Sequence, residues 1–397
     1  MTAAVRPAGP GAALAAARGL VPALAARAAE LDRTGAFPGD DVDDLRAAGL
    51  LGVMVPERLG GLGATFAEYA EVAIALGEGN GATALVFNMH ASVTGAFART
   101  PEPLARALGA PDSWFAARDR VLAGARAGEL YAVAMSERGA GARLSALTCS
   151  YRSVPGGFHV VGSKAFVSGA GHAHAYLVAA RDATSEAPRV SYFLVPAGDG
   201  VVVEPTWDSL GMRATGSHDL HLDVVVANDA LVGGVEGVAL LLAQVMPQWL
   251  VASYAAVYVG VAKAAVAAAV AHVAERSLGA LPAVRARIGR ADARVAAAEL
   301  ATLEAARRVD DAPGDRETNR WVYRAKLLAG DTAAAVAASM LEAAGSAATR
   351  RGHPLERLFR DARCGALQPA TSDVCADWLG LAATGRDPDQ GAELPRW

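Results

Sequence analysis

The chain has 397 residues, of which 53% are hydrophobic and 20% charged, and its formal net charge is -4. This length is enough to bury a full hydrophobic core divided into two or three domains. Lys and Arg are scattered among Asp and Glu, so the basic patch of a nucleic-acid-binding protein is missing. Three cysteines without CxxC spacing, Cys149, Cys364 and Cys375, indicate reduced thiols in the cytoplasm better than a disulfide framework.

The first part of the chain has a helical pattern. Residues 1–20 carry Arg6 and Arg18 and have no continuous apolar stretch, so we expect no signal peptide. From Gly11 to about Arg126 the pattern is helical, with apolar residues recurring at spacings of three and four. The segment 55–63 interrupts this pattern, because proline and clustered glycines cannot continue a helix. We therefore expect an α-helical domain over residues 1–127.

A block of predicted strands follows. Short runs rich in Val, Tyr and Phe alternate with Gly, Pro, Asn and Asp, which is typical of strands and turns. The runs are Tyr131–Met135, Phe158–Val161, Ala175–Ala179, Val190–Val195, Gly200–Val203 and Leu220–Val226. Because these strands do not alternate with helices, we expect an antiparallel β domain over residues 128–233 and not a βαβ sheet.

The last part of the chain is helical again. Residues 234–397 are expected to form a four-helix bundle from Val238–Arg276, Leu281–Val309, Arg316–Gly345 and a shorter helix over Thr371–Leu381. The segment Val238–Val273 is long and apolar enough to span a bilayer. It is rich in Ala and lacks an aromatic belt and basic flanks, so we favour a buried helix, or one at an oligomer interface, over a membrane span.

This order of domains resembles the acyl-CoA dehydrogenase superfamily, and short motifs along nearly the whole chain are similar to those of that family. Residues 55–63 (VPERLGGLG) resemble its PE-x-x-GG-x-G loop, and residues 134–141 (AMSERGAG) resemble its TEPGAGSD flavin loop. Residues 162–168 (GSKAFVS), 210–219 (LGMRATGSHD) and 353–361 (HPLERLFRD) follow in the family's order. The resemblance implies an α+β fold of the acyl-CoA dehydrogenase type and an FAD site.

The resemblance also implies which residues bind the flavin. Backbone amides and a hydroxyl of the AMSERGAG loop would bind the ring, its glycines would approach the pyrophosphate, Phe166 would pack on the ring and Ser168 would bond toward N5. In this family a neighbouring subunit completes the site, so a homo-oligomer, either a dimer or a tetramer, is expected. The implied flavin-binding residues are Met135, Ser136, Gly141, Phe166, Ser168, Arg276, Gly345, Ser346, Thr371 and Asp373.

The chain departs from the family at the position of the catalytic base. The dehydrogenase motif YEGT aligns with Gln368-Pro369-Ala370-Thr371, which places Pro369 where the glutamate would be. Removal of an α proton requires a group that can accept it, and proline cannot. Some members carry the base on the first long bundle helix, but residues 247–251 (PQWLV) contain no Asp or Glu.

This departure favours the oxygen-using branch of the superfamily, the two-component monooxygenases. Such an enzyme takes FADH2 from a separate flavin reductase and transfers oxygen from a flavin C4a-hydroperoxide, here to a bulky hydrophobic or aromatic substrate in bacterial secondary metabolism. We assign His90 as the group that binds the peroxide or deprotonates the substrate, with Ser168 near N5 of the flavin. A histidine satisfied in the core is the alternative interpretation of His90. The predicted pocket wall consists of Phe87, Trp249, Tyr254 and Tyr258.

Two other functions stay open at this point. The first is an acyl-CoA or acyl-carrier-protein α,β-dehydrogenase with a displaced base, and the second is a flavin-binding partner without catalysis. The run Ser217-His218-Asp219 does not form a catalytic triad, because consecutive residues of a strand point to opposite faces. No third metal ligand accompanies His172 and His174, so we expect no metal site.

Overall fold

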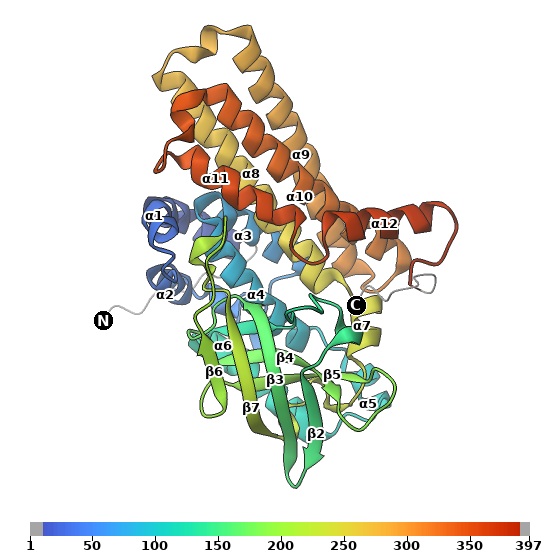
Figure 1. Cartoon of the computed structure of the whole chain (residues 1–397). Helices are drawn as coiled ribbons and strands as arrows, with labels where there is room; N and C mark the ends of the chain where they lie inside the picture. The colour runs from blue at the N-terminus through green and yellow to red at the C-terminus, as the bar shows by residue number, and fades with distance from the viewer. Residues whose placement is uncertain (1–10, 390–397) are drawn as a thin grey trace.

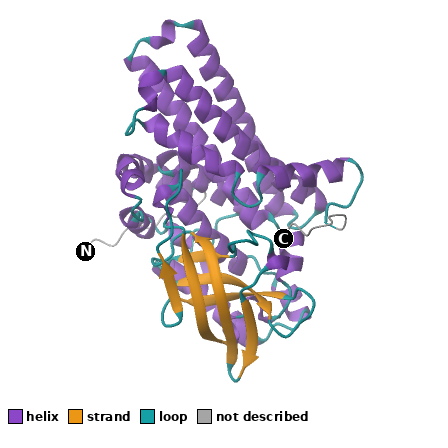
Figure 2. Ribbon diagram, viewed as in Figure 1, coloured by secondary structure: helices purple, strands orange, loops and turns teal. Residues whose placement is uncertain are grey.

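The computed structural model describes residues 11–389. Its helical, strand and helical blocks follow one another in the predicted order, which confirms the fold class (Figure 1). The long bundle helices stand at one end of the molecule and the sheet at the other (Figure 2). The boundaries proposed for the three domains stay predictions.

The N-terminal block contains six helices among the described residues. They are α1 (Ala12–Thr34), α2 (Gly39–Ala47), α3 (Phe66–Gly79), α4 (Gly81–Ala98), α5 (Glu102–Ala107) and α6 (Asp112–Ala127). A capping box between Thr65 and Glu68 begins α3, and the Asn80 side chain begins α4 by accepting from the amide of Ala82. Nearly every residue of α4 is buried, because this helix lies between the sheet and the bundle.

Within residues 11–389 the sheet has seven strands. They are β1 (Tyr131–Ala134), β2 (Ser150–Val154), β3 (Gly157–Val167), β4 (Ala175–Asp182), β5 (Val190–Pro196), β6 (Val201–Glu204) and β7 (His218–Ala227). The strand order is β1-β4-β2-β3-β7-β6, with β5 also paired to β4. Four pairings are antiparallel, as expected, but β4 runs parallel to both β1 and β2. The expectation of a purely antiparallel sheet needs this correction, because the connection 135–149 lets β1 and β2 flank β4 in the same direction.

The C-terminal block is built on three long helices. Its elements are α7 (Ala239–Val245), α8 (Gln248–Glu275), α9 (Pro282–Asp311), α10 (Arg316–Ala344), α11 (Pro354–Arg363) and α12 (Ser372–Ala383). The single helix expected over Val238–Arg276 is interrupted at Pro247, which has no amide hydrogen to donate. Helix α11 was not predicted.

Helix α8 is apolar because it is packed on several sides. It contacts α3, α4, α9, α10 and α11. Gly260 allows the close crossing with α3, since a Cβ atom there would lie 2.3 Å from the carbonyl oxygen of Ile74. By length and composition alone, Ala12–Thr34, Ala252–Glu275 and Arg316–Ala344 could each cross a membrane. In this fold 56% of the apolar window of Ala252–Glu275 is buried inside the protein, so packing accounts for its composition.

Candidate functional site

A cavity of about 560 Å³ lies between the β domain and the helical bundle. One wall comes from α4, from β1 and the loop after it, from the end of β3 and from the segment before β7. The opposite wall comes from α7, α8 and residues 364–374. The cavity brings together seven residues predicted from the sequence: Met135, Ser136, Gly141, Phe166, Ser168, Tyr254 and Thr371.

A buried ion pair holds the loop that follows β1 in place. Lys164 Nζ lies 2.8 Å from Glu137 Oε1, and it also donates to the carbonyl of Met135. Glu137 in turn accepts from the amide and hydroxyl of Thr148 and from the amide of Cys149. Burial alone would raise the pKa of Glu137, but the charge and hydrogen bond of Lys164 and the bonds from Thr148 hold it below its ordinary value. The loop is therefore fixed before any ligand binds.

The glycine-rich part of the same loop has an open backbone, and its Gly141 lines the cavity. Glu137 and Gly141 exchange two backbone hydrogen bonds of 2.9 Å, which close a tight turn. Gly139 and Gly141 have φ angles of 90° and 62°, a region that favours glycine. A Cβ atom on either glycine would meet nothing within 4 Å, so a ligand can approach this backbone closely. Successive amides in such turns bind anions, which suits the phosphate of a flavin.

Three hydroxyl groups form a chain along the cavity wall. Ser168 Oγ lies 2.9 Å from Ser217 Oγ, which lies 2.6 Å from Thr215 Oγ1, and Thr215 donates to the carbonyl of Met212 at 2.9 Å. Because a carbonyl can only accept, the proton of Thr215 is committed to it. Ser217 then donates to Thr215 and Ser168 donates to Ser217, which leaves the Ser168 oxygen as an acceptor on the cavity side.

The rest of the wall is apolar, apart from a few polar groups. Met89, Leu85, Leu367 and Val374 line it, as do aromatic side chains, and Phe166 is 62% exposed. Among the described residues that line the cavity, Arg143 is the one charged side chain, and no Asp, Glu, His or Lys lines it. Burial raises the pKa of the Cys364 thiol to about 11, so this group stays protonated near neutral pH. A flavin ring, with its polar edge and apolar faces, fits this set of hydroxyls, backbone amides and aromatic groups.

The structure corrects the assignment of His90. Its ring is fully buried and does not line the cavity. Nδ1 accepts from the amide of Tyr131 at 3.1 Å, so Nε2 carries the proton and donates to the carbonyl of Leu51 at 2.7 Å. Burial lowers the pKa of His90 to about 4. Both ring nitrogens therefore serve to join the β domain to the N-terminal helices, and neither faces a reactant.

Three of the four predicted pocket residues are also misplaced. Phe87 is fully buried and packs against Tyr69, on the other side of α4 from the cavity residues Leu85 and Met89. The Trp249 ring packs edge-on against Phe66. The Tyr258 ring packs directly against Gly365. Tyr254 alone of the four lines the cavity.

The remaining predicted flavin contacts lie outside the cavity of their own chain. Asp373 is exposed in the first turn of α12. Arg276 ends α8 and lines a separate cavity of about 530 Å³ with His272 and His353. Gly345 and Ser346 follow the end of α10, close in sequence to Ala347 of that second cavity. Their contribution through a neighbouring subunit stays a prediction.

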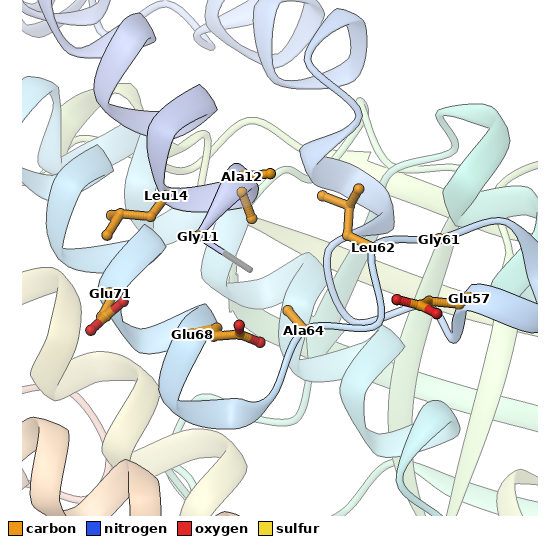
Figure 3. A pocket seen from close by; sticks show the side chains of 10 residues that line it. Gly11, Ala12, Leu14, Glu57, Gly61, Leu62, Ala64, Glu68 and Glu71 are labelled. Atoms are coloured by element: carbon orange, nitrogen blue, oxygen red, sulfur yellow. The ribbon is translucent and has the colours of Figure 1, made fainter. Parts of the chain in front are cut away.

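Carboxylates gather in a different and smaller cavity. Figure 3 shows Glu57, Glu68 and Glu71 around a cavity of about 200 Å³ beside the start of α1. It shares no lining residue with the 560 Å³ cavity, and Glu68 is already used in the capping box of α3. In the part of the chain that the structure describes, no three His, Cys, Asp or Glu side chains gather as metal ligands.

Several cavity residues were missed by sequence reasoning. Tyr192 lies on β5 and Trp207 in the loop after β6, and nothing in their local sequence marks them. In the sequence Gln368 was noted only because it aligns with the tyrosine of the YEGT motif, and it also lines the cavity. Arg143 stands where the family's TEPGAGSD motif has its final Asp, and this departure was the available signal.

Comparison with known proteins agrees with this fold. Residues 14–100, 132–225 and 252–372 match the N-terminal, middle and C-terminal domains of acyl-CoA dehydrogenase. The chain is 32% identical over 392 residues to the amino sugar nitrososynthase DnmZ of Streptomyces peucetius, which covers 92% of this chain and 91% of that protein.

Two solved structures contain a flavin in the same fold. KijD3 in complex with FMN and dTDP-3-amino-2,3,6-trideoxy-4-keto-3-methyl-D-glucose superimposes with a TM-score of 0.82 at 28% identity, covering 98% of each chain. TdsC from Paenibacillus sp. A11-2 in complex with FMN and indole has a TM-score of 0.83 at 25% identity, covering 95% of this chain and 98% of that one.

Proposed function

Because the chain belongs to the acyl-CoA dehydrogenase family and is a flavin-dependent oxidoreductase, we propose that it is a monooxygenase of a bulky, largely apolar substrate. One oxygen atom of O2 enters the substrate and the other leaves as water, while a reduced flavin is oxidised. The cofactor supplies the activation of O2. The protein's own residues hold the ring, orient the substrate and exclude water.

The composition of the cavity wall carries this proposal. Dehydrogenation of an acyl thioester needs a base at the α carbon, and Pro369, which aligns with the family's catalytic glutamate, lines the cavity in its place. The other lining groups are apolar side chains, hydroxyls, an amide, a neutral thiol and one guanidinium, none of which removes such a proton readily near neutral pH. Oxygen transfer makes no such demand, and a dry apolar wall protects a reactive flavin from water.

For the cofactor, we propose FAD, as the resemblance of the loop Met135–Gly141 to the family's flavin loop implies, delivered in reduced form by a separate flavin reductase, as in the two-component monooxygenases. KijD3 and TdsC hold FMN, whose ring and phosphate could use the same loop. Equilibrium competition between FAD and FMN for the purified protein distinguishes the two. We also propose a cytoplasmic homo-oligomer in which Arg276 and Gly345-Ser346 reach the flavin of a neighbouring subunit.

A second candidate substrate follows from the relatives. DnmZ acts on an amino sugar, and KijD3 binds a dTDP-linked one, which makes N-oxygenation of a nucleotide-linked amino sugar the alternative. Arg143 is the observation in its favour, because an exposed guanidinium at a cavity wall suits a diphosphate.

The reaction of the reduced protein with oxygen tests the proposal. The protein, loaded with chemically reduced flavin, is mixed with oxygenated buffer in a stopped-flow spectrometer. A persistent absorbing species that is neither reduced nor oxidised flavin is expected, followed by ¹⁸O incorporation into a substrate such as indole. Immediate return to oxidised flavin, together with bleaching of the oxidised flavin by butyryl-CoA, would instead indicate a dehydrogenase with a displaced base.

A further inference from the structure

Gln368 has an unusual position for a polar residue. It follows the short helical turn Cys364–Ala366 and precedes α12, and its half-buried side chain lines the apolar part of the cavity. Its Oε1 atom accepts a hydrogen bond of 2.8 Å from the hydroxyl of Tyr258. Tyr258 is fully buried in α8, so its hydroxyl has a fixed place. The oxygen end of the Gln368 amide is therefore held by the protein.

The backbone of Gln368 is fixed as well. Lys326 of α10 is fully buried, and its Nζ donates to the carbonyls of Gly365 at 2.7 Å and of Gln368 at 3.1 Å. No carboxylate of the described residues forms an ion pair with this ammonium group, so the two carbonyls are its partners. Burial lowers the pKa of Lys326 to about 8, because the charged form of the side chain loses its hydration there. Gly330 permits the close contact, because a Cβ atom on it would lie 2.9 Å from the carbonyl oxygen of Gly365.

The nitrogen end of the Gln368 amide has no partner within residues 11–389. No hydrogen bond is donated by Nε2, although Oε1 has its bond from Tyr258. Some polar atoms of the described residues are fully enclosed by protein and lack a partner, such as Gln248 Nε2 and Asn319 Oδ1. Gln368 Nε2 is not one of these enclosed atoms. Gln368 lines the cavity, and its Nε2 is neither bonded to a described residue nor enclosed by protein. This amide nitrogen is therefore open to the cavity space.

We propose that Gln368 Nε2 is the hydrogen-bond donor that orients the substrate, by binding a neutral oxygen or nitrogen acceptor such as a carbonyl, an ether or an aromatic ring nitrogen. A neutral amide in an apolar wall matches a neutral acceptor, because an anion would lose its hydration there without gaining a countercharge. Tyr258 and Lys326 act as positioning residues for this donor. The inference rests on the proposed function only in placing the substrate in this cavity.

Equilibrium binding of two probes of nearly equal shape tests the donor. Quinoline carries one acceptor nitrogen, and naphthalene carries none. Calorimetry on the flavin-loaded protein gives the ratio of the two affinities for the wild type, Gln368→Leu and the isosteric Gln368→Glu. We expect both variants to lower the ratio of quinoline to naphthalene affinity by about 2- to 10-fold, the range for one hydrogen bond. Tyr258→Phe, which frees the amide to rotate, should lower it by a smaller factor.

Two controls separate a donor from a structural role. Leu367→Val alters the same wall without touching a donor and should shift both affinities together, so that their ratio is unchanged. Flavin affinity, measured by fluorescence quenching, should be unchanged in Gln368→Leu. An affinity ratio that stays within twofold of the wild type in Gln368→Leu would overturn the proposal, and so would failure of the wild type to bind either probe. Because no oxygen is consumed, a failure of the monooxygenase proposal leaves these binding results interpretable.

Discussion

Lys164 and Glu137 form an ion pair with a distance of 2.8 Å between Nζ and Oε1, and their side chains are 0% and 3% exposed. The pair joins β3 to the loop that follows β1, and Glu137 extends the connection to Thr148 and Cys149. Such a pair is costly to break from one side, because the remaining charge stays buried. The architecture of the candidate flavin site therefore depends on two residues that do not line the cavity.

Replacement of Lys164 by methionine should destabilise the protein by about 3–5 kcal/mol and weaken flavin binding, because Glu137 is left buried and unpaired. Urea denaturation and flavin fluorescence quenching measure the two effects. The double variant Lys164→Met/Glu137→Gln is the control and should recover part of the lost stability. A single variant that unfolds within 1 kcal/mol of the wild type would contradict a structural role for this pair.

The sequence predicted the fold, and the loop after β1 that lines the cavity, more accurately than the rest of the cavity wall. Helical and strand blocks differ in the spacing of their apolar residues, and the flavin loop is one continuous segment, so both are local signals. Strand β2 escaped prediction because its sequence, SYRSV, alternates polar groups with few strong strand formers. Its parallel pairing with β4 depends on contacts between distant residues.

The wall was mispredicted because α4 and α8 are apolar around most of their circumference. Leu85 and Met89 are four residues apart and share the face of α4 that lines the cavity, while Phe87 points away from it. Hydrophobicity cannot distinguish these faces when each face packs against protein. On α8 the same ambiguity led to Tyr258 being predicted as a wall residue. Its hydroxyl instead donates a hydrogen bond to the wall residue Gln368.

His90→Gln should flatten the dependence of stability on pH. The pKa of His90 is lowered from 6.5 to about 4 in the folded protein. Between these pH values the unfolded chain binds a proton at His90 and the folded protein does not. The stabilisation is complete above about pH 6.5 and is lost as the pH falls toward 4, by about 3 kcal/mol at most. Urea denaturation at several pH values should show this loss in the wild type and not in the variant.

The same variant tests the corrected role of His90 in the reaction. If His90 only joins two domains, the folded variant should oxidise substrate at a rate within a few-fold of the wild type. A loss of more than 100-fold with unchanged stability and flavin affinity would restore the original assignment as a catalytic residue.

Ser217→Ala should weaken the binding of reduced flavin relative to oxidised flavin. In the wild type the hydroxyl chain leaves Ser168 as an acceptor, which suits the N–H group that a flavin ring gains on reduction. Without Ser217, the Ser168 proton is free to turn toward the cavity. The ratio of reduced to oxidised affinity should fall about 2- to 10-fold, seen as a more negative potential of the bound flavin. Thr215→Ser keeps the chain and should leave this potential unchanged.

Arg276→Ala should lower flavin affinity although Arg276 lies outside the cavity of its own chain. The expectation depends on a neighbouring subunit bringing this residue to the flavin phosphate region. Sedimentation of the wild type should show a dimer or tetramer. Unchanged flavin affinity in a variant that keeps the same oligomeric state would remove Arg276 from the site.

Arg143→Gln should reduce affinity for FMN more than affinity for riboflavin, which has the same ring but no phosphate. Arg143 has no acidic partner within the part of the chain that the structure describes, and it follows the open backbone of Gly139 and Gly141. Since the guanidinium is exposed, we expect an effect of about 2- to 5-fold that weakens in high salt. Arg143→Lys keeps the charge and should retain most of the preference for FMN. Equal losses for FMN and riboflavin would show that Arg143 supports the loop and does not bind phosphate.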